Sequence, residues 1–265
     1  MDDIIRAIRD DEIQLYRKNG WVRLDKFYSP ELVNELLARA RKRMGELPLT
    51  ISRTAPTERM PDEYRWYSRW DGCSHTDDFF HSVSHSKALA KVAASLMDSK
   101  VRFYFDHIFV KNPTSRQGTE TPWHQDLPHH PLDRQGALTI WAPLMECPPE
   151  MGTMRFLNGS HKAGLFGRYL NRSDGICLVD EYPSLLDEYE LSPVLHLQPG
   201  DVTIHNLAVI HYAQPNQTSS PRWVYACQWL PAKARYTGAP NHRTDGLGLQ
   251  IDQPFEHARF PEIAV

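Results

Sequence analysis

The amino-acid sequence predicts a mainly β fold with flanking α-helices, and two observations support this prediction. From Val101 onward, short alternating runs of apolar and polar residues are separated by clusters of Pro, Gly and Asn, a spacing typical of antiparallel sandwiches and barrels. Before Val101, apolar residues recur at helical spacing. Because no linker separates the two parts, we expect one domain over residues 1–265, with a mostly helical flank and lid segment (1–100), a β core (101–235) and a C-terminal tail (236–265).

The first third of the chain contains the expected helices and one strand. A broken helical pattern covers residues 2–18, and the alternating residues 21–27 predict a strand. Ser29 is suited to cap a helix over residues 30–44, because the proline that follows it fits the first turn of a helix. A further short helix is expected over residues 86–97.

Residues 48–72 show no periodicity and are rich in Arg, Pro, Tyr and Trp. A long irregular segment inside a compact domain is usually either functional or mobile. The sequence therefore predicts an active-site cover in this segment, with a plain surface excursion as the alternative.

The β core is expected to contain short strands that alternate between an apolar and a polar face. The expected strands cover residues 101–111, 123–127, 137–144, 153–157, 194–197, 201–205 and 222–230, and a further strand begins near residue 211.

Charge, cysteine usage and hydropathy exclude several classes of partner. A net charge of -3 gives no overall basic field, so we do not expect nucleic acid as the main partner. No run of apolar residues approaches membrane-spanning length, so no membrane partner is expected. The four cysteines are scattered without a C-x-x-C pair, which predicts a reduced, cytoplasmic protein without a zinc knuckle or a disulfide framework. They are Cys73, Cys147, Cys177 and Cys227.

The candidate site begins with His124 and Asp126. In an extended strand their side chains point to the same face, so an imidazole and a carboxylate can hold one metal ion. His205 and His211 are the candidates for a third ligand, and alternation alone does not choose between them. Arg222 favours His211, because a hairpin in the loop between them would bring these two residues back side by side.

These residue types fit one kind of oxidative chemistry. Two histidines and one carboxylate on one face of a metal form the facial triad of non-haem Fe(II) oxygenases, which leaves positions open for other ligands. The planar guanidinium of arginine binds a carboxylate bidentately and stays charged. The set of His124, Asp126, His211 and Arg222 therefore predicts a site for Fe(II) and 2-oxoglutarate.

Several longer motifs accompany this set. They are Val110-Lys111-Asn112-Pro113, Thr121-Pro122-Trp123-His124-Gln125-Asp126, Leu138-Thr139-Ile140-Trp141-Ala142-Pro143-Leu144, residues 152–162, the Pro199-Gly200-Asp201 turn, and the step of eleven residues from His211 to Arg222. On these motifs the sequence resembles the phytanoyl-CoA dioxygenase family of Fe(II)/2-oxoglutarate-dependent oxygenases, over nearly the whole chain.

The resemblance implies a double-stranded β-helix core, of the jelly-roll or cupin-like kind, and assigns roles to the residues of the site. His124, Asp126 and His211 would be the catalytic iron ligands, and Arg222 would bind the distal carboxylate of 2-oxoglutarate. Secondary contacts with this co-substrate are implied for Lys111, Thr139 and Trp141. The other co-substrate would be O2.

The implied activity is that of a dioxygenase that oxidises a C–H bond and releases succinate and CO2. The carboxylate of Asp126 favours hydroxylation, with desaturation or ring formation as variants, because related halogenases replace this carboxylate with a small residue. The alternative from another class is a cupin-like protein that binds a metal without catalysis or in a non-redox role. Arg222 argues against this alternative, because such a protein has no need of a carboxylate anchor.

The residues expected to line the substrate pocket are Phe103, Phe105, His107 and His129. They predict a small, largely apolar organic substrate, such as a natural-product intermediate. The sequence predicts no particular oligomeric state.

Overall fold

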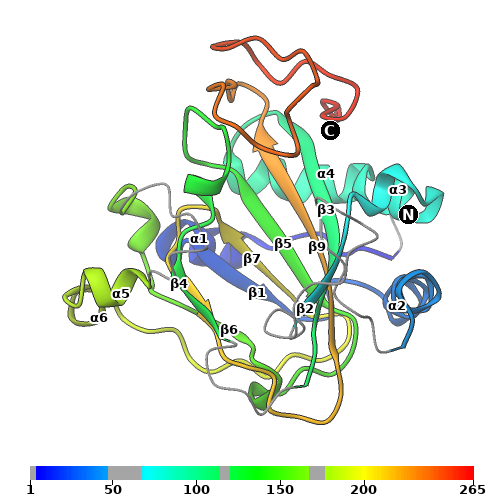
Figure 1. The fold of residues 1–265 in the computed structure, drawn as a ribbon, viewed down its shortest axis with the longest axis vertical. Coiled ribbons are helices and arrows are strands. Elements are labelled where there is room, and N and C mark those ends of the chain that lie inside the picture. The colour runs from blue at the N-terminus through cyan, green and yellow to red at the C-terminus, as the bar shows by residue number, and fades with distance from the viewer. Residues whose placement is uncertain (1–3, 47–66, 114–119, 167–176) are drawn as a thin grey trace.

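Two antiparallel β-sheets face each other at the centre of the protein (Figure 1). The structure is a computed structural model that describes residues 4–46, 67–113, 120–166 and 177–265. The six-stranded sheet contains, in spatial order, β1 (Trp21–Leu24), β7 (Val202–Asn206), β5 (Leu138–Pro143), β9 (Arg222–Pro231), β3 (Val101–Lys111) and β2 (Tyr67–Asp71). The three-stranded sheet contains β4 (Thr121–His124), β8 (His211–Ala213) and β6 (Met154–Phe156).

The helices of the described chain are α1 (Asp10–Asn19), α2 (Pro30–Met44), α3 (Asp78–Ser84), α4 (Lys87–Met97), α5 (Leu178–Glu181) and α6 (Leu185–Glu188). Helices α2, α3 and α4 contribute apolar side chains to the same core as the outer face of the six-stranded sheet. Figure 1 shows these three helices on one side of that sheet, with α5 and α6 beside the three-stranded sheet. None of the helices described here is both long and apolar enough to cross a lipid bilayer.

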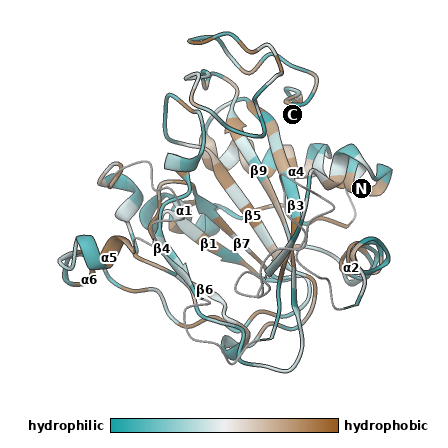
Figure 2. Cartoon of the chain, in the orientation of Figure 1, coloured by the Kyte–Doolittle hydropathy of each residue, from teal (hydrophilic) through white to brown (hydrophobic). Residues whose placement is uncertain are grey.

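The alternation of β9 explains how one strand serves two layers. Trp223 and its alternate neighbours face the helices and belong to the larger apolar core. Val224 and Ala226 face the other way, into a second core shared with the three-stranded sheet. All ten residues of β9 are buried. In Figure 2 the strands of this sheet show apolar residues interspersed with paler and more hydrophilic ones.

Helix α2 forms where the sequence predicts it. The Ser29 side chain accepts a hydrogen bond from the Leu32 backbone nitrogen, and a proline occupies the first turn. The buried residues Leu32, Val33, Leu36 and Ala40 lie on one face of the helix. Each large apolar side chain buried here contributes about 1.5–3 kcal/mol to folding.

Three of the sequence predictions need correction. The first helix begins at Asp10 rather than near residue 2, because the preceding chain is extended and Ile5 pairs with Tyr28 in an isolated bridge. The segment 194–197 is not a strand, because only Leu197 pairs, in a bridge with Cys147. Within residues 48–72, residues 67–71 form β2, which pairs with β3. Residues 47–66 lie outside the described structure, so the active-site cover stays a prediction.

The sequence predicts a hairpin between β8 and β9, and this prediction is wrong. Strand β8 pairs with β4 and β6, whereas β9 pairs with β3 and β5 in the other sheet. His211 and Arg222 therefore lie in opposing sheets, at the first residue of β8 and of β9.

A β-bulge in β3 corrects one predicted pocket residue. The register between β3 and β9 shifts between Phe103 and Phe105. Phe103 consequently faces the helix layer, where its ring contacts Trp229 and His85, and it does not reach the space between the sheets. Phe105 is displaced to the other face. An extra residue reverses the direction of the side chains that follow it, which is why simple alternation fails here.

The C-terminal segment after β9 lies across one end of the sheets, at the top of Figure 1. It is held there by a small apolar cluster in which Phe255 and Phe260 pack around Tyr104. This arrangement brings the tail, residues 236–265, next to the β3 residues that face the interior.

Candidate metal centre

Three side chains that can bind a metal meet between the two sheets. They are His124 at the end of β4, Asp126 in the turn that follows, and His211 at the start of β8. Their ligand atoms all lie within 4.8 Å of one another. The pairing of β4 with β8 places His124 directly opposite His211. Asp126 is not part of the strand, since its backbone is helical (φ -75°, ψ -35°) and opens a short 3-10 turn.

The backbone fixes which nitrogen of each histidine is available to a metal. Nδ1 of His124 lies 2.7 Å from the Pro122 carbonyl oxygen, and Nδ1 of His211 lies 3.1 Å from the Val209 carbonyl oxygen. A carbonyl oxygen only accepts hydrogen bonds, so Nδ1 carries the hydrogen in both rings. Nε2 is therefore the nitrogen of each ring that remains for a metal, and in both rings it faces Asp126.

The carboxylate of Asp126 has a different neighbour at each oxygen. Oδ1 lies 3.4 Å from Nε2 of His124 and 4.0 Å from Nε2 of His211, whereas Oδ2 lies 3.4 Å from Nε2 of His205. Burial by itself would raise the pKa of Asp126, but its contacts with the His124 and His205 rings outweigh burial and hold the pKa well below the usual range. The group is therefore a carboxylate at neutral pH.

Burial also controls the charge of His211. It lowers the pKa of this imidazole well below the usual value, so the ring is neutral at neutral pH and able to bind a cation.

The residue between the first two ligands anchors their backbone. Gln125 points away from the centre, and its Nε2 donates to the carbonyl oxygens of Gly164, at 2.8 Å, and Ala208, at 2.6 Å. Its Oε1 accepts from the Phe166 backbone nitrogen at 2.9 Å. These bonds join the turn after β4 to the bend between β7 and β8. Strand β7 carries His205, and strand β8 carries His211.

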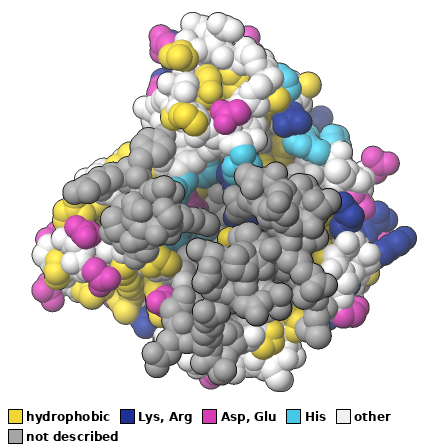
Figure 3. Space-filling view, viewed as in Figure 1, with side chains coloured by type: hydrophobic (Ala, Val, Ile, Leu, Met, Phe, Trp, Pro, Cys, Tyr) yellow, Lys and Arg dark blue, Asp and Glu magenta, His cyan; other side chains and the backbone are white. Residues whose placement is uncertain are grey.

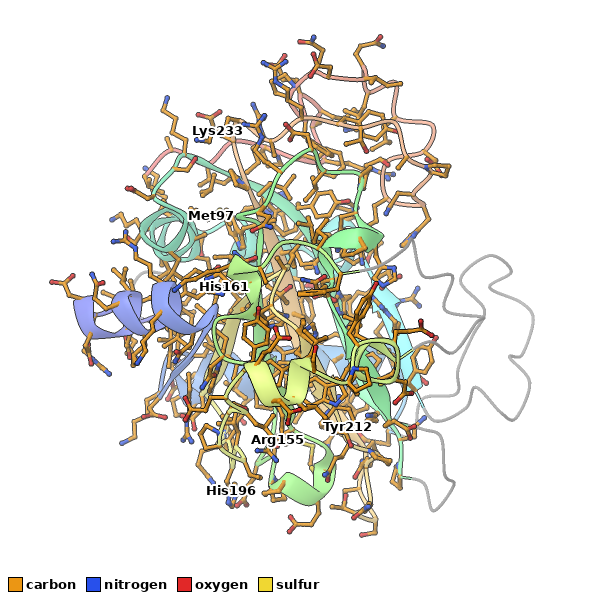
Figure 4. All side chains as sticks on the ribbon, turned by 90° about the vertical axis from the view of Figure 1, so that its left-hand side faces the viewer. Met97, Arg155, His161, His196, Tyr212 and Lys233 are labelled. Carbon is orange, nitrogen blue, oxygen red and sulfur yellow. The ribbon has the colours of Figure 1, made fainter. Side chains whose placement is uncertain are left out.

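The outer side of the three-stranded sheet has a different composition. Arg155 on β6 and Tyr212 on β8 are cross-strand partners, and both are labelled in Figure 4. Their neighbours on the same strands, Phe156 and His211, face inward and their rings lie 6.0 Å apart. Alternation along these two short strands thus separates the centre from the solvent-facing side.

Arg222 is a buried cation in the six-stranded sheet, which lies opposite the sheet that carries His124 and His211. Its side chain is 1% exposed, and its guanidinium donates to the Gly152 carbonyl oxygen. The guanidinium carbon lies 5.3 Å from the centre of the Trp141 ring and 5.7 Å from that of Phe109. Among the described residues, its Nε has no hydrogen-bond partner and no carboxylate forms an ion pair with it. A guanidinium in this setting is suited to bind an anion.

Lys111 lies beside this arginine. The two residues are direct partners in the pairing of β3 with β9. The Lys111 ammonium donates to the carbonyl oxygens of Ala213, at 3.3 Å, and Gln214, at 2.5 Å. Burial, followed by the nearby Arg222 charge, lowers the pKa of Lys111 to about 6. The two basic side chains lie next to the segment that leaves β8, two residues beyond His211.

The other predicted site residues are spread along the interior. Trp141 contacts Arg222, as described above, whereas Thr139 lies at the opposite end of β5, where its hydroxyl accepts from Nε2 of Gln228 at 3.2 Å. Phe105 and His107 both face the interior, and their rings lie 5.6 Å apart. The carbonyl oxygen of His129 accepts from Asn241 of the C-terminal segment at 2.8 Å.

A cavity of about 170 Å³ lies beneath the C-terminal segment. Phe105 forms part of its wall, and its ring stacks against Arg243, whose guanidinium carbon lies 3.8 Å from the ring centre. Arg243 also donates to Oε1 of Gln228 and contacts Nδ1 of His130, both at 3.1 Å. The cavity is lined by Asp71, Gly72, His75, Tyr104, Phe105, His242, Arg243, Arg259 and Phe260. Figure 3 shows histidine and basic side chains gathered around the hollow below this segment.

No pattern in the sequence points to Arg243. The C-terminal tail has no periodicity that would direct its side chains, and the arginine reaches the interior only because Phe255 and Phe260 anchor the tail on Tyr104. In the sequence, His205 is a candidate ligand only as the alternative to His211. The structure instead places both histidines at the same carboxylate, at different oxygens.

Comparison with known proteins relates this arrangement to oxygenases. The family model described as phytanoyl-CoA dioxygenase matches residues 16–224. A curated relative, the probable alpha-ketoglutarate-dependent hypophosphite dioxygenase of Stutzerimonas stutzeri, is 24% identical over 213 residues, which cover 78% of this chain and 73% of the relative.

Solved structures share the whole fold. The non-haem alpha-ketoglutarate-dependent carbocyclase SnoK from nogalamycin biosynthesis superposes with a TM-score of 0.80 at 21% identity, covering 97% of both chains. The epimerase SnoN, solved in complex with Fe3+, alpha-ketoglutarate and nogalamycin RO, gives a TM-score of 0.76 at 21% identity, covering 96% of this chain and 98% of SnoN. These likenesses confirm the predicted fold class, a mainly β core of the double-stranded β-helix kind with flanking helices.

Proposed function

The chain belongs to the phytanoyl-CoA dioxygenase family of Fe(II)/2-oxoglutarate-dependent oxygenases, as its motifs predicted, and from this premise we propose what its own residues do. His124, Asp126 and His211 hold Fe(II), and Arg222 binds the distal carboxylate of 2-oxoglutarate. With O2 as the second co-substrate, the protein oxidises a C–H bond of a small organic molecule.

The single observation that carries this proposal is the state of Arg222. A buried guanidinium with an unpartnered Nε is costly unless an anion joins it. The donor set opposite it, two imidazoles and one carboxylate, is the set that non-haem Fe(II) oxygenases use. A dicarboxylate that reaches from the metal to Arg222 satisfies both needs, and a bare metal-binding cupin would leave Arg222 unexplained.

When bound, iron and 2-oxoglutarate would supply the oxidising chemistry, in which one substrate, one O2 and one 2-oxoglutarate give one oxidised substrate, one succinate and one CO2. The chain supplies placement. His124 and His211 present their Nε2 lone pairs because carbonyl oxygens hold their Nδ1 hydrogens. Arg222 fixes the far end of the co-substrate, while the apolar walls around Trp141 and Phe109 exclude water from it.

Lys111 adds a second positive group to this end of the site. Because its pKa is lowered to about 6 by burial, its charge is regained when an anion binds beside it. Its bonds to the carbonyl oxygens of Ala213 and Gln214 hold the chain that follows His211 against the wall that carries Arg222. Lys111 thereby links the strand of the metal ligand His211 to the strand of the co-substrate anchor Arg222.

The cavity beneath the C-terminal segment is the proposed place of the substrate. Phe105, Tyr104 and Phe260 offer apolar surface, and Arg243 offers a polar group held by Gln228 and His130. Of the other predicted pocket residues, His107 has its ring 5.6 Å from that of Phe105, and the His129 carbonyl oxygen accepts from Asn241, the residue before His242. This lining suits a largely apolar molecule with a few polar substituents, such as a natural-product intermediate.

Hydroxylation is the proposed outcome, with Asp126 occupying the position at which a halide would need room. Ring formation is the second candidate, because SnoK, which shares the fold over nearly its full length, is described as a carbocyclase. The two outcomes differ in the mass of the product, since hydroxylation adds one oxygen atom and ring closure removes two hydrogen atoms.

The test is anaerobic binding of Fe(II) and 2-oxoglutarate to the purified protein. We expect a weak visible charge-transfer band that requires both additions, and its loss in the Asp126→Ala variant. A control variant, Arg155→Gln, changes a cation on the outer face of the three-stranded sheet and should keep the band. The proposal fails if the wild type gives no band, or if the band survives unchanged in a protein that carries both Asp126→Ala and Arg222→Ala.

The substrate is then sought by adding small molecules in air and measuring succinate release, followed by the mass of the product. A compound that stimulates succinate release and gains one oxygen atom supports hydroxylation. A product lighter by two hydrogen atoms replaces hydroxylation with ring closure or desaturation.

A further inference from the structure

His205 is a third histidine at the carboxylate of Asp126, and it differs from the two proposed ligands. It is 2% exposed, on the inner face of β7, between its cross-strand partners Trp21 and Thr139. Its Nε2 lies 3.4 Å from Oδ2 of Asp126, whereas the other two histidines lie on the Oδ1 side. Its ring centre is 4.8 Å from that of His211.

The hydrogen on His205 is placed by its surroundings. Nδ1 of His205 is buried and has no hydrogen-bond partner in the part of the chain that the structure describes, so no carbonyl oxygen there holds the hydrogen, unlike in the other two rings. The only acceptor within reach of the imidazole in the described structure is Oδ2 of Asp126. The ring therefore carries a hydrogen on Nε2 and donates it to this oxygen.

A carboxylate beside a metal can bind through one oxygen or through both. Asp126 would block one of the open metal positions if Oδ2 also turned to the ion, and 2-oxoglutarate needs two positions for its own chelate. A hydrogen bond to Oδ2 opposes this second mode, because the oxygen would have to give up its donor in a buried site.

On the basis of the proposed function, we propose that His205 is a positioning residue that keeps Asp126 a one-oxygen ligand: by donating from Nε2 to Oδ2, it reserves the metal position that 2-oxoglutarate occupies. His205 does not touch the metal in this arrangement. It acts through Asp126, and its effect falls on co-substrate binding rather than on metal binding.

Two variants separate the hydrogen bond from the space that the ring fills. His205→Leu keeps an apolar side chain without a donor, and His205→Gln restores an N–H donor on a side chain of similar reach. His196→Leu is the matched control, because Nε2 of His196 also contacts a carboxylate, Oε1 of Glu146, at 2.8 Å. That contact is on the surface at the lower end of the molecule in Figure 4.

The measurements are two dissociation constants, taken without O2. One is that of Fe(II) for the protein alone, and the other is that of 2-oxoglutarate for the iron-saturated protein. In His205→Leu we expect 2-oxoglutarate to bind about tenfold more weakly and Fe(II) no more weakly than in the wild type. His205→Gln should return the 2-oxoglutarate constant to within about threefold of the wild-type value, and His196→Leu should change neither constant.

Other outcomes overturn the inference. If His205→Leu weakens Fe(II) binding while 2-oxoglutarate binding to the saturated protein is unchanged, His205 supports the ligand set and does not control how Asp126 binds. If His205→Gln behaves as His205→Leu does, the donor is not the cause. Should the leucine variant not fold, as judged by thermal unfolding of the metal-free protein, His205→Ala gives the same comparison.

The wild type distinguishes this failure from failure of the proposed function. A wild-type protein that does not bind 2-oxoglutarate with iron contradicts the proposed function itself. A wild type that binds both, with a leucine variant equal to it in both constants, contradicts only the role of His205.

Discussion

The six-stranded and the three-stranded sheet contribute to the site in different ways. The strands of the smaller sheet are only three or four residues long, and they present His124 and His211 through a few ladder pairs and two carbonyl contacts. The larger sheet presents Arg222 and Lys111 from β9 and β3, strands of ten and eleven residues that are packed against helices. Local backbone bonds thus position the site residues of the smaller sheet, whereas packing in the core positions those of the larger sheet.

This difference indicates how each part of the site should respond to change. Metal binding depends on three side chains and their nearest backbone groups, so a single substitution there removes function and leaves the core intact. Co-substrate binding depends on the Arg222 cation buried in the larger sheet. Substitutions there should therefore weaken 2-oxoglutarate binding by degrees rather than abolish it. The predictions that follow test this division, from the largest expected effect to the smallest.

The largest effect is expected for His211→Ala. It removes one of three proposed ligands, so iron-dependent succinate formation should fall to background and tight Fe(II) binding should be lost. Tyr212→Phe, the next residue along β8 but on the outer side, is the control and should retain both. Measurable succinate formation in His211→Ala above that of the metal-free protein would show that the smaller sheet does not supply the third ligand.

Arg222→Gln should act on the opposite wall. Removing one partner of a buried charged contact costs about 3 kcal/mol, so we expect about a 100-fold weaker binding of 2-oxoglutarate with Fe(II) binding retained. Arg222→Lys keeps the charge but not the planar fork and should lie between the two. If Arg222→Gln binds 2-oxoglutarate as well as the wild type, the anchor is elsewhere.

Gly152→Ala should disturb the place where the two sheets contact each other near Arg222. Gly152 has φ +77°, its carbonyl oxygen accepts from Arg222, and an added Cβ would lie 2.1 Å from the Gln214 carbonyl oxygen. Strain and collision together should lower the free energy of unfolding by about 2 kcal/mol or more, measured by denaturant titration.

Gly164→Ala is the matched control for this change. Gly164 also has a positive φ, +93°, but an added Cβ would meet nothing within 4 Å. It should therefore cost only the conformational strain, about 1 kcal/mol. Equal losses in the two variants would mean that the contact between Gly152 and Gln214 does not hold the walls together.

The sequence predicts the walls better than it predicts how they meet. Alternation within β9 and the cap of α2 by Ser29 are local signals, and both were recovered with nearly correct bounds. The pair of His124 and Asp126 was found for the same reason, although Asp126 lies in a helical turn rather than in the strand.

Features that depend on distant partners were missed or misread. The bulge that turns Phe103 toward the helices arises from the pairing of β3 with β9, which no pattern within β3 reveals. The crossing from β8 to the opposite sheet resembles a hairpin in sequence, because a polar loop joins two apolar strands in both cases. Arg243 reaches the interior through the packing of a tail without periodicity, so its sequence position carries no information about its place.

The smallest effect concerns a carboxylate on the helix side of the larger sheet. Asp106 on β3 is buried, and its oxygens accept from Ser74 and from the Tyr225 hydroxyl. Burial raises its pKa from an ordinary value of 3.8 to about 7, and these hydrogen bonds oppose the rise only in part. Asp106→Asn removes the titration while keeping a side chain of the same shape.

The sign of the expected pH dependence follows from the raised pKa. Between about pH 4 and pH 7 the folded protein keeps a proton on Asp106 that the unfolded chain has lost, so the wild type loses stability as the pH rises through this window, by roughly 1 kcal/mol per pH unit. Below pH 4 this contribution is fully present. The difference in unfolding free energy between wild type and Asp106→Asn should therefore shrink, and then favour the variant, as the pH rises from 4 to 7. A difference that stays constant over this range would mean that Asp106 is already ionised in the folded protein, and that the helix side of the larger sheet tolerates a buried charge as the metal wall does.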